Sequence, residues 1–192
     1  MANFQRLQLC LLLLAAACVA PAAAKGAARM PEHAAFTLVK PATLQEFRAL
    51  MAAEPDDVVA ARDNAQHSPL NMAAFHGNPE AVELLLAAGA DASNPDTSGH
   101  TPLHHAVISA TNSPDTAARI IDALVKAGAK TEAQDGKGCT PMQWTHMQAG
   151  KSPSSAAAAQ RLTAGGAKSS PAMENWFKYK SPKKGKGWRC PT

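Results

Sequence analysis

The stretch TPLHHAVISATNSPDTAARIIDALVKAGAKTEAQDGKGC, residues 101–139, carries the signals of two short helices followed by a turn. Thr101 can cap a helix by accepting an early backbone N–H, and the proline after it suits the first helical position. The second helical segment has an apolar stripe, and Gly128 can end it in a left-handed conformation. Asp135 and Gly138 are typical of a tight turn. The stretch therefore predicts a helix–turn–helix unit with a projecting turn.

The same signals occur three times along the chain. Residues 68–100 form a first unit of 33 residues, residues 101–139 form a second, and a third begins at residue 140. The second unit is six residues longer than the first, and its extra residues lie between the two helical segments, where the third unit also has an insertion. A repeat of this length with insertions at one point indicates a solenoid of stacked helix pairs.

This repeat resembles the ankyrin repeat. TPLHHA matches the family signature T-P-L-H-x-A, and the first unit keeps the frame G…AV.LLL.AGAD…D..G at the usual spacing. The resemblance covers residues 68–167 and implies an all-α fold, an ankyrin-repeat solenoid of paired antiparallel helices with projecting β-hairpin-like fingers. The signature histidine is replaced by Asn71 in the first unit and by Gln143 in the third. The second helix of the third unit is poor in large apolar residues, so we expect that end to be weakest unless something covers it.

The chain then divides into a repeat array and an extension at each end. We expect the protein to be a monomer. The segments are a signal peptide at 1–24, an N-terminal arm at 25–40, a degenerate N-terminal ankyrin capping repeat at 41–67, an ankyrin repeat at 68–100, an ankyrin repeat with an insertion at 101–139, a degenerate C-terminal ankyrin repeat at 140–168, and a basic aromatic tail at 169–192.

Residues 1–24 have the pattern of an export signal. Arg6 supplies a positive charge, an apolar run follows, and three alanines at 22–24 offer a cleavage site of small residues. The apolar run is short for a membrane span, which needs about 20 residues. We therefore expect an exported protein, periplasmic or secreted. Retention of the segment as a membrane anchor and lipid attachment at Cys18 are the alternatives.

Export changes what the cysteines predict. Cys10 and Cys18 lie in the expected leader, which leaves Cys139 and Cys190 in the mature chain. Two cysteines in an oxidising compartment favour one disulfide. Two unpaired thiols are the alternative, because the sequence does not show whether their Cα atoms lie within bonding range.

HTPLHHAV, residues 100–107, contains His100, His104 and His105. The resemblance implies that His104 is structural, with its ring bonded to backbone and a neighbouring turn. Adjacent helix residues do not face the same way, and three zinc ligands would have to converge at about 2.0–2.1 Å. The sequence therefore predicts no metal site and no cofactor. An envelope metal carrier that uses these histidines is a weaker hypothesis, which a zinc titration would test.

Catalytic signatures do not accompany the repeats. The sequence has no GxSxG elbow, no glycine-rich phosphate loop and no HExxH motif. Repeat arrays present extended concave surfaces rather than deep, dry pockets. We therefore predict that the protein is not an enzyme.

The ankyrin resemblance implies a binding groove made by the finger tips and by the exposed face of the first helix of each repeat. Phe75, Ile108 and Met147 occupy equivalent positions and form an apolar stripe across the repeats, a feature that often marks an interaction site. We predict a non-enzymatic protein–protein interaction module for an unidentified protein partner, inhibitory or chaperone-like by analogy. The alternative is that the chain's own arm or tail covers the stripe. Carried over position by position, the partner-binding residues are Met72, Phe75, His76, His100, His105, Ile108, Trp144 and Met147.

The C-terminal tail is basic and aromatic. Residues 178–192 hold six Lys and Arg, whereas residues 25–177 hold 12 Lys and Arg against 15 Asp and Glu, a net charge of −3. Basic residues interleaved with aromatics can hold anionic lipid or single-stranded nucleic acid, and for an exported protein we expect no nucleic acid. The alternative function is therefore surface tethering, in which the tail contacts anionic membrane or polymer. A further interpretation is that residues 176–179 cap the third repeat.

Overall fold

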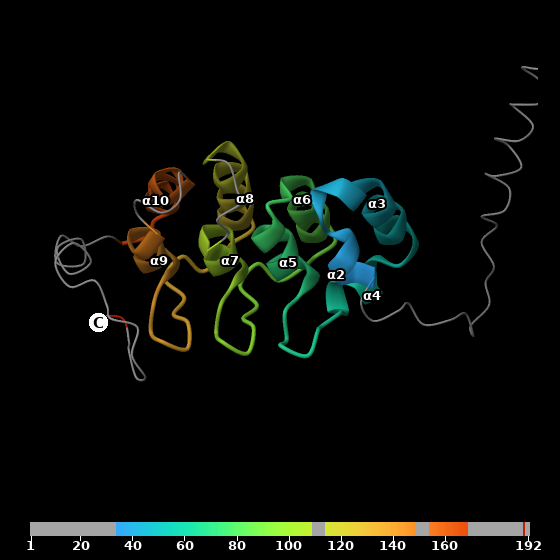
Figure 1. The fold of residues 1–192 in the computed structure, drawn as a ribbon, viewed down its shortest axis with the longest axis horizontal. Coiled ribbons are helices and arrows are strands. Elements are labelled where there is room, and N and C mark those ends of the chain that lie inside the picture. The colour runs from blue at the N-terminus through green and yellow to red at the C-terminus, as the bar shows by residue number, and fades with distance from the viewer. Residues whose placement is uncertain (1–33, 109–113, 149–153, 169–189, 191–192) are drawn as a thin grey trace, which may run out of the picture. The chain divides into compact units, whose positions relative to one another are not determined.

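The computed structural model of the protein describes residues 34–108, 114–148, 154–168 and 190 (Figure 1). The expected leader, the expected insertions and the tail except Cys190 lie outside these residues. In the described ranges no helix is both long and apolar enough to cross a bilayer. The helices are α2 (Ala34–Leu38), the 3-10 turn η1 (Pro41–Thr43), α3 (Leu44–Ala53), α4 (Pro55–Ala60), α5 (Pro69–His76), α6 (Pro79–Ala87), α7 (Pro102–Ile108), α8 (Pro114–Lys126), α9 (Pro141–Gln148) and α10 (Ser154–Ala164).

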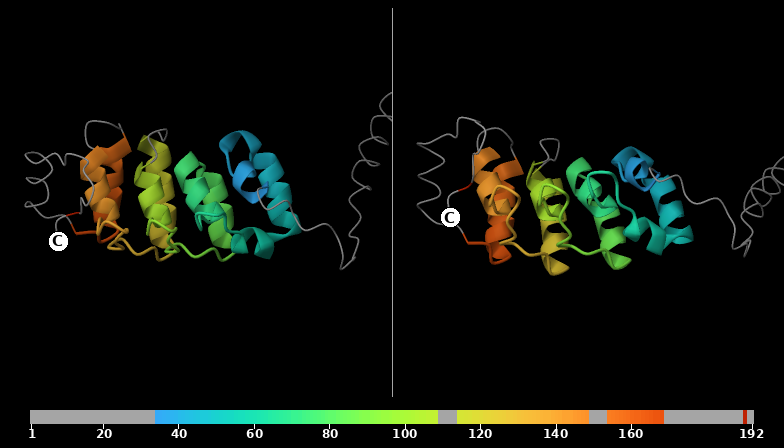
Figure 2. Two further views of the ribbon diagram at one scale, coloured as in Figure 1. Left: turned by 60° about the horizontal axis from the view of Figure 1, so that its bottom comes forward. Right: turned by 90° about the horizontal axis from the view of Figure 1, so that it is seen from below.

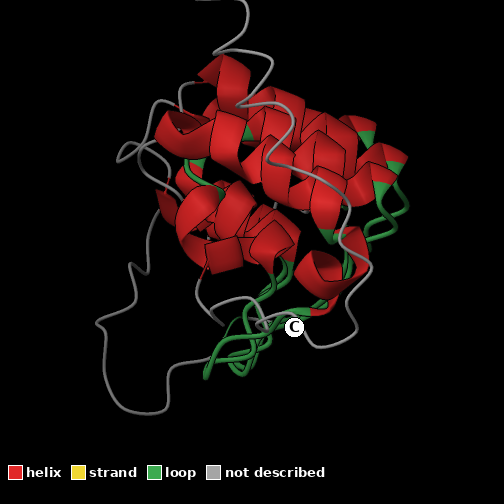
Figure 3. Ribbon diagram, turned by 90° about the vertical axis from the view of Figure 1, so that its right-hand side faces the viewer, coloured by secondary structure: helices red, strands yellow, loops and turns green. Residues whose placement is uncertain are grey.

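The helices of the repeats form two parallel rows. The first helices α5, α7 and α9 pack side by side, and the second helices α6, α8 and α10 form the other row (Figures 1 and 2). Three loops, which we call the fingers, project from the first row in one direction (Figure 3). They comprise residues 61–67, 90–100 and 129–139, and the described residues contain no β-strand.

Capping side chains set where the helices begin. Ser68 Oγ accepts a hydrogen bond from Asn71 N at 3.1 Å, and Asn78 Oδ1 accepts one from Ala81 N at 3.1 Å. A proline occupies the first turn of each of these helices, where a missing N–H costs nothing. Gly77 ends α5 with a φ of 69°, a left-handed conformation that favours glycine. Each repeat is therefore defined by its own local signals.

Small and large side chains alternate in the core. Leu70, Leu103 and Met142 occupy equivalent positions in the first helices and are almost fully buried. Alanines buried on the same helices, such as Ala73 and Ala106, let neighbouring repeats approach closely. Apolar side chains of the second helices close the core from the other side. These are Val82 and Leu85 from α6, Ile120, Ile121 and Leu124 from α8, and Leu162 from α10.

The signature histidine has the structural role that the resemblance implies. His104 is fully buried, its Nδ1 accepts from Thr101 N at 3.1 Å, and its Nε2 lies 3.0 Å from the carbonyl oxygen of Cys139 in the next finger. Gln143 reproduces the first of these bonds, since its Oε1 accepts from Thr140 N at 2.7 Å. The side chain of Asn71 is too short to do so, and its buried side-chain amide has no hydrogen-bond partner among the described residues.

The N-terminal repeat is more complete than the sequence indicates. We expected an arm at 25–40 followed by a capping repeat at 41–67, but α2 lies within the expected arm and packs on both α3 and α5. Phe36 and Val39 are buried there, and Asn78 Nδ2 donates to the carbonyl oxygen of Val39 at 2.8 Å. The capping repeat therefore begins within the expected arm and contains α2, α3 and α4. The sequence signal is weak because α2 has only five residues and buries only two of them.

Cys190 extends the row of fingers at the C-terminal end. Gly136 N donates to the carbonyl oxygen of Ser98 in the preceding finger at 2.7 Å, and Cys190 N donates in the same way to the carbonyl oxygen of Lys137 at 3.0 Å. A disulfide joins Cys190 to Cys139, with 5.0 Å between their Cα atoms. Cys190 therefore occupies the place that the next finger would take.

The unpaired side-chain amide of Asn71 leads to a stability prediction. Asn71→His should supply an acceptor for Ser68 N and a donor for the carbonyl of His100, as His104 does one repeat later. We expect a gain of about 1–2 kcal/mol in the free energy of unfolding, because two buried hydrogen bonds form. Urea denaturation followed by circular dichroism measures the gain. The matched variant Gln143→His should change stability less, and a destabilised Asn71→His protein would contradict the equivalence of these positions.

Removal of the disulfide should destabilise the array. The bond closes a loop between residues 51 positions apart, for which the chain-entropy model gives about 4 kcal/mol as an upper value. The double variant Cys139→Ser, Cys190→Ser should therefore unfold at lower urea than the oxidised protein. Dithiothreitol should lower the midpoint of the native protein towards that of the variant and leave the variant unaffected. Equal midpoints for both proteins before reduction would show that the bond does not hold the tail in solution.

Candidate functional site

The surface formed by α5, α7 and α9 contains the expected groove residues, but it exposes them unequally. Phe75 is the only exposed large hydrophobic side chain among the described residues, with 39% of its surface accessible. Ile108 and Met147, at the equivalent positions, are half-buried, as are Met72, His76 and Trp144. His105 was expected in the exposed groove, but it is 93% buried, since only 7% of it is accessible. It contributes to the base of this surface rather than to its exposed face.

An aspartate closes each finger in the same way. Asp63, Asp96 and Asp135 stand at equivalent positions, and the Oδ1 atom of each accepts two backbone N–H groups, two and four residues further on. The six N–O distances lie between 2.7 and 2.9 Å. Because Oδ1 is held by the finger backbone, Oδ2 of each carboxylate is directed to other side chains.

These second oxygens and two histidines form a continuous polar row between the fingers. His67 lies between two carboxylates, with Nδ1 2.8 Å from Asp63 Oδ2 and Nε2 3.4 Å from Asp96 Oδ2. His100 repeats this arrangement one finger later, with Nδ1 3.6 Å from Asp96 Oδ2 and Nε2 3.4 Å from Asp135 Oδ2. The row runs Asp63, His67, Asp96, His100, Asp135 and links all three fingers.

Side chains of the first helices α7 and α9 also contact the carboxylates of this polar row. His105 Nε2 lies 3.0 Å from Asp96 Oδ2, and Trp144 Nε1 donates to Asp135 Oδ2 at 2.9 Å. These two residues occupy equivalent positions in α7 and α9. Trp144 therefore has a structural role in addition to its predicted place in the groove.

Burial and hydrogen bonding set the ionisation of the row. Burial alone would raise the pKa of Asp96, but hydrogen bonds from the backbone of His100 and Ser98 and from the His105 ring lower it below its usual value. Burial lowers the pKa of His105 to about 4, although the nearby Asp96 opposes the change. At neutral pH Asp96 is thus a carboxylate and His105 a neutral imidazole.

The three clustered histidines make different contacts, although the His100 ring packs against both His104 and His105, with centroids 5.7 Å apart in each pair. His104 turns to the Cys139 carbonyl, while the His105 ring packs edge-on against His67, with centroids 5.4 Å apart. Sequence reasoning missed His67, which lies well before the cluster. The signal was the spacing Asp-x-x-x-His, present in RDNAQH and again in DTSGH at the same point of two successive repeats.

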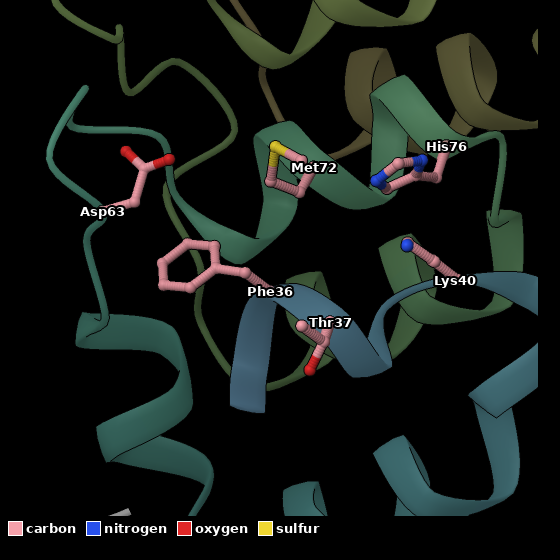
Figure 4. Close-up of a pocket in the computed structure, with 6 residues that line it drawn as sticks. All are labelled: Phe36, Thr37, Lys40, Asp63, Met72 and His76. Carbon is pink, nitrogen blue, oxygen red and sulfur yellow. The ribbon is translucent and has the colours of Figure 1, made fainter. Parts of the chain in front are cut away.

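A hollow of about 330 Å³ opens at the N-terminal end of the groove (Figure 4). Its walls combine apolar and charged side chains from α2, α5 and the first finger. Burial and the charge of Lys40 lower the pKa of His76. Six residues line the hollow: Phe36, Thr37, Lys40, Asp63, Met72 and His76.

The second-helix row presents a different surface. Ion pairs link successive second helices, with N–O distances of 2.9, 3.0 and 3.2 Å. They join Arg48 to Glu80, Arg119 to Glu83, and Arg161 to Asp122. All six side chains are about half exposed, so each pair contributes little to stability. The two faces of the array thus differ clearly, one being charged and the other bearing the exposed phenylalanine.

Comparison with known families agrees with this architecture. The family model of ankyrin repeats, in three copies, matches residues 44–135. This match, with the paired helices and the repeated fingers, makes the described chain an all-α ankyrin-repeat solenoid. Comparison with curated proteins finds no match. Ankyrin repeats are protein–protein interaction modules and are typically non-catalytic, so the fold supports a binding role at this coarse level.

The buried bond from Trp144 to Asp135 leads to a prediction. Trp144→Phe keeps an aromatic ring but removes the donor to a carboxylate whose side chain is only 1% exposed. We expect the free energy of unfolding to fall by about 1–3 kcal/mol, because the buried Asp135 Oδ2 loses its indole donor. Urea denaturation of this variant and of Met147→Leu, a control without such a bond, measures the difference. Equal stability of the two variants would show that the indole N–H is not needed.

Proposed function

We propose that this array is a non-enzymatic binding protein that holds a protein partner across α5, α7, α9 and the fingers. The exposure of Phe75 carries the proposal. An aromatic ring exposed to 39% on a surface whose other large side chains are half-buried is the kind of anchor that protein interfaces favour at their centre. The charged surface of the second helices lacks such an anchor among the described residues.

The hollow beside α5 supports the same location. Met72 and His76 line it, and both stand on the helix that carries Phe75. Phe36 and Met72 supply apolar walls, and Lys40 supplies a positive charge. If an apolar side chain of the partner entered this hollow, it would be removed from water. Burial of this kind is how anchor residues contribute most of their binding energy.

Export is the second part of the proposal. The leader pattern at 1–24 supports it, and so does the disulfide between Cys139 and Cys190, because such bonds persist mainly in oxidising compartments. The partner is then an envelope or extracellular protein, which the array inhibits or escorts. Surface tethering through the basic tail stays an alternative from the sequence, since residues 169–189 lie outside the described part of the chain.

A capture experiment tests the proposal. The bait is the oxidised chain from residue 25, and the prey is an envelope extract of the source organism at high and at low salt. The groove variant is Phe75→Ala, Met147→Ala, which leaves the structural Trp144 in place. The control is Glu83→Ala, Arg119→Ala on the second-helix surface. We expect a protein that native and control baits retain at high salt and that the groove variant loses.

The purified partner then allows a quantitative test. Truncation of a central anchor typically costs about 2 kcal/mol or more in binding free energy, so the groove variant should raise the Kd by roughly 30-fold or more. Equal Kd values for native and groove variant would place the interface elsewhere. Binding that disappears at high salt and on deletion of residues 178–192 would instead favour the basic tail.

A further inference from the structure

Three potential metal ligands from different elements meet beside the groove. They are His67 Nε2 at the end of the first finger, Asp96 Oδ2 in the second finger and His105 Nε2 in α7. These atoms all lie within 4.8 Å of one another. Asp96 Oδ2 is 3.0 Å from His105 Nε2 and 3.4 Å from His67 Nε2.

The spacing suits a tetrahedral metal ion. Bonds of about 2.0–2.1 Å to nitrogen and oxygen place tetrahedral ligand atoms about 3.3 Å apart. The separations of 3.0 and 3.4 Å from Asp96 Oδ2 bracket that value, and the two histidine nitrogens lie within 4.8 Å of each other, so side-chain adjustments alone would bring the three atoms around one ion. Two imidazoles and one carboxylate suit zinc and its neighbours, whereas calcium and magnesium prefer oxygen ligands alone.

Further contacts orient two of the three ligands as metal sites require. His67 Nδ1 lies 2.8 Å from Asp63 Oδ2, so Nε2 is the ring nitrogen that faces the site. Asp96 Oδ1 is held by two backbone N–H groups, so Oδ2 is the oxygen that faces the two histidines. His105 is neutral at neutral pH, and a metal ion at Nε2 would displace its proton to Nδ1. His67 and Asp96 are thus preorganised by the fold, whereas His105 binds after this proton shift.

Accessibility differs among the three ligands. The side chain of His67 is 27% exposed, whereas those of Asp96 and His105 are only 2% and 9% exposed. An ion could therefore reach the site past His67 and would have a coordination position left for water or for a donor from outside. His100 stands nearby, with Nδ1 3.6 Å from Asp96 Oδ2, but it is not part of the converging group.

We propose that His67, Asp96 and His105 bind one divalent transition-metal ion of the zinc class. This replaces our expectation from the sequence that the protein has no metal site, which did not take His67 into account. The proposal goes beyond the proposed function and is independent of any partner. Because the ligands come from two fingers and α7, the ion would fix neighbouring repeats to each other next to Phe75.

A zinc titration of the full chain tests the proposal. All samples carry Cys10→Ser and Cys18→Ser so that no free leader thiol competes, and calorimetry measures stoichiometry and Kd. We expect saturable binding of one Zn²⁺ per chain and a zinc-dependent rise in Tm, since an ion that binds only the folded state stabilises it. His67→Gln and His105→Gln should lose both effects. His76→Gln, a half-buried histidine outside the ligand set, should keep both.

The variant Asp63→Asn distinguishes zinc binding at this oriented site from zinc binding at other histidines of the surface. The asparagine Oδ1 would still accept the two finger N–H groups, but its Nδ2 would donate to His67 Nδ1 and place the ring proton on Nε2. We expect zinc affinity to fall about 10–100-fold, as for other residues that orient metal ligands. Circular dichroism checks that each variant is folded, and the solvent-exposed His67→Gln keeps the test valid if His105→Gln does not fold. Absence of saturable binding in the parent protein, or an unchanged Kd in His67→Gln, would overturn the proposal.

Discussion

The structure depends on the clasp that an aspartate makes at the base of each finger. One carboxylate oxygen accepts two backbone N–H groups of its own finger, and this occurs in three successive fingers with nearly the same distances. A loop without strands would otherwise leave these donors unpaired. The clasp also sets the register between fingers, because Thr97 N and Gly136 N can then donate to the preceding finger. A side chain at Gly99 would meet Gly136 N at 2.7 Å, so the fingers pack backbone against backbone.

The second oxygen of each clasp connects this architecture to function. In Asp96 and Asp135 this oxygen is directed to the first-helix surface, where it meets the His105 ring and the Trp144 indole N–H, whereas in Asp63 it contacts His67. The groove is therefore built on a polar base and carries an apolar stripe above it. This arrangement supports binding of a protein partner at Phe75, and it places two imidazoles and a carboxylate around one point. A rigid base of this kind reduces the ordering cost of binding.

Local signals made much of the fold predictable. Ser68, Pro69 and the glycines after each helix mark repeat boundaries, and the role of His104 follows from its place in the signature. These features depend on residues close in sequence or on one repeat interval. Helix α2, which lies before residue 41, was missed because its five residues are too few to show a helical period.

Contacts between repeats were harder to predict. His67 meets Asp96 and His105 only because two fingers and a helix stack in one register, which the sequence does not state. The burial of His105 likewise depends on its neighbours, so its assignment to an exposed groove was wrong. Pairing of Cys139 with Cys190 was left open for the same reason, since a distance across 51 residues cannot be inferred from composition.

Residue-resolved amide hydrogen exchange tests the aspartate clasp most directly. The backbone N–H groups of His67, His100 and Cys139 donate to the aspartate carboxylates and make no hydrogen bond within a helix. Protection of these amides from exchange must therefore come from the carboxylates. The account predicts protection of these three amides comparable with that of helix amides in the same repeats. Exchange at the rate of an open loop, while the helices stay protected, would contradict it.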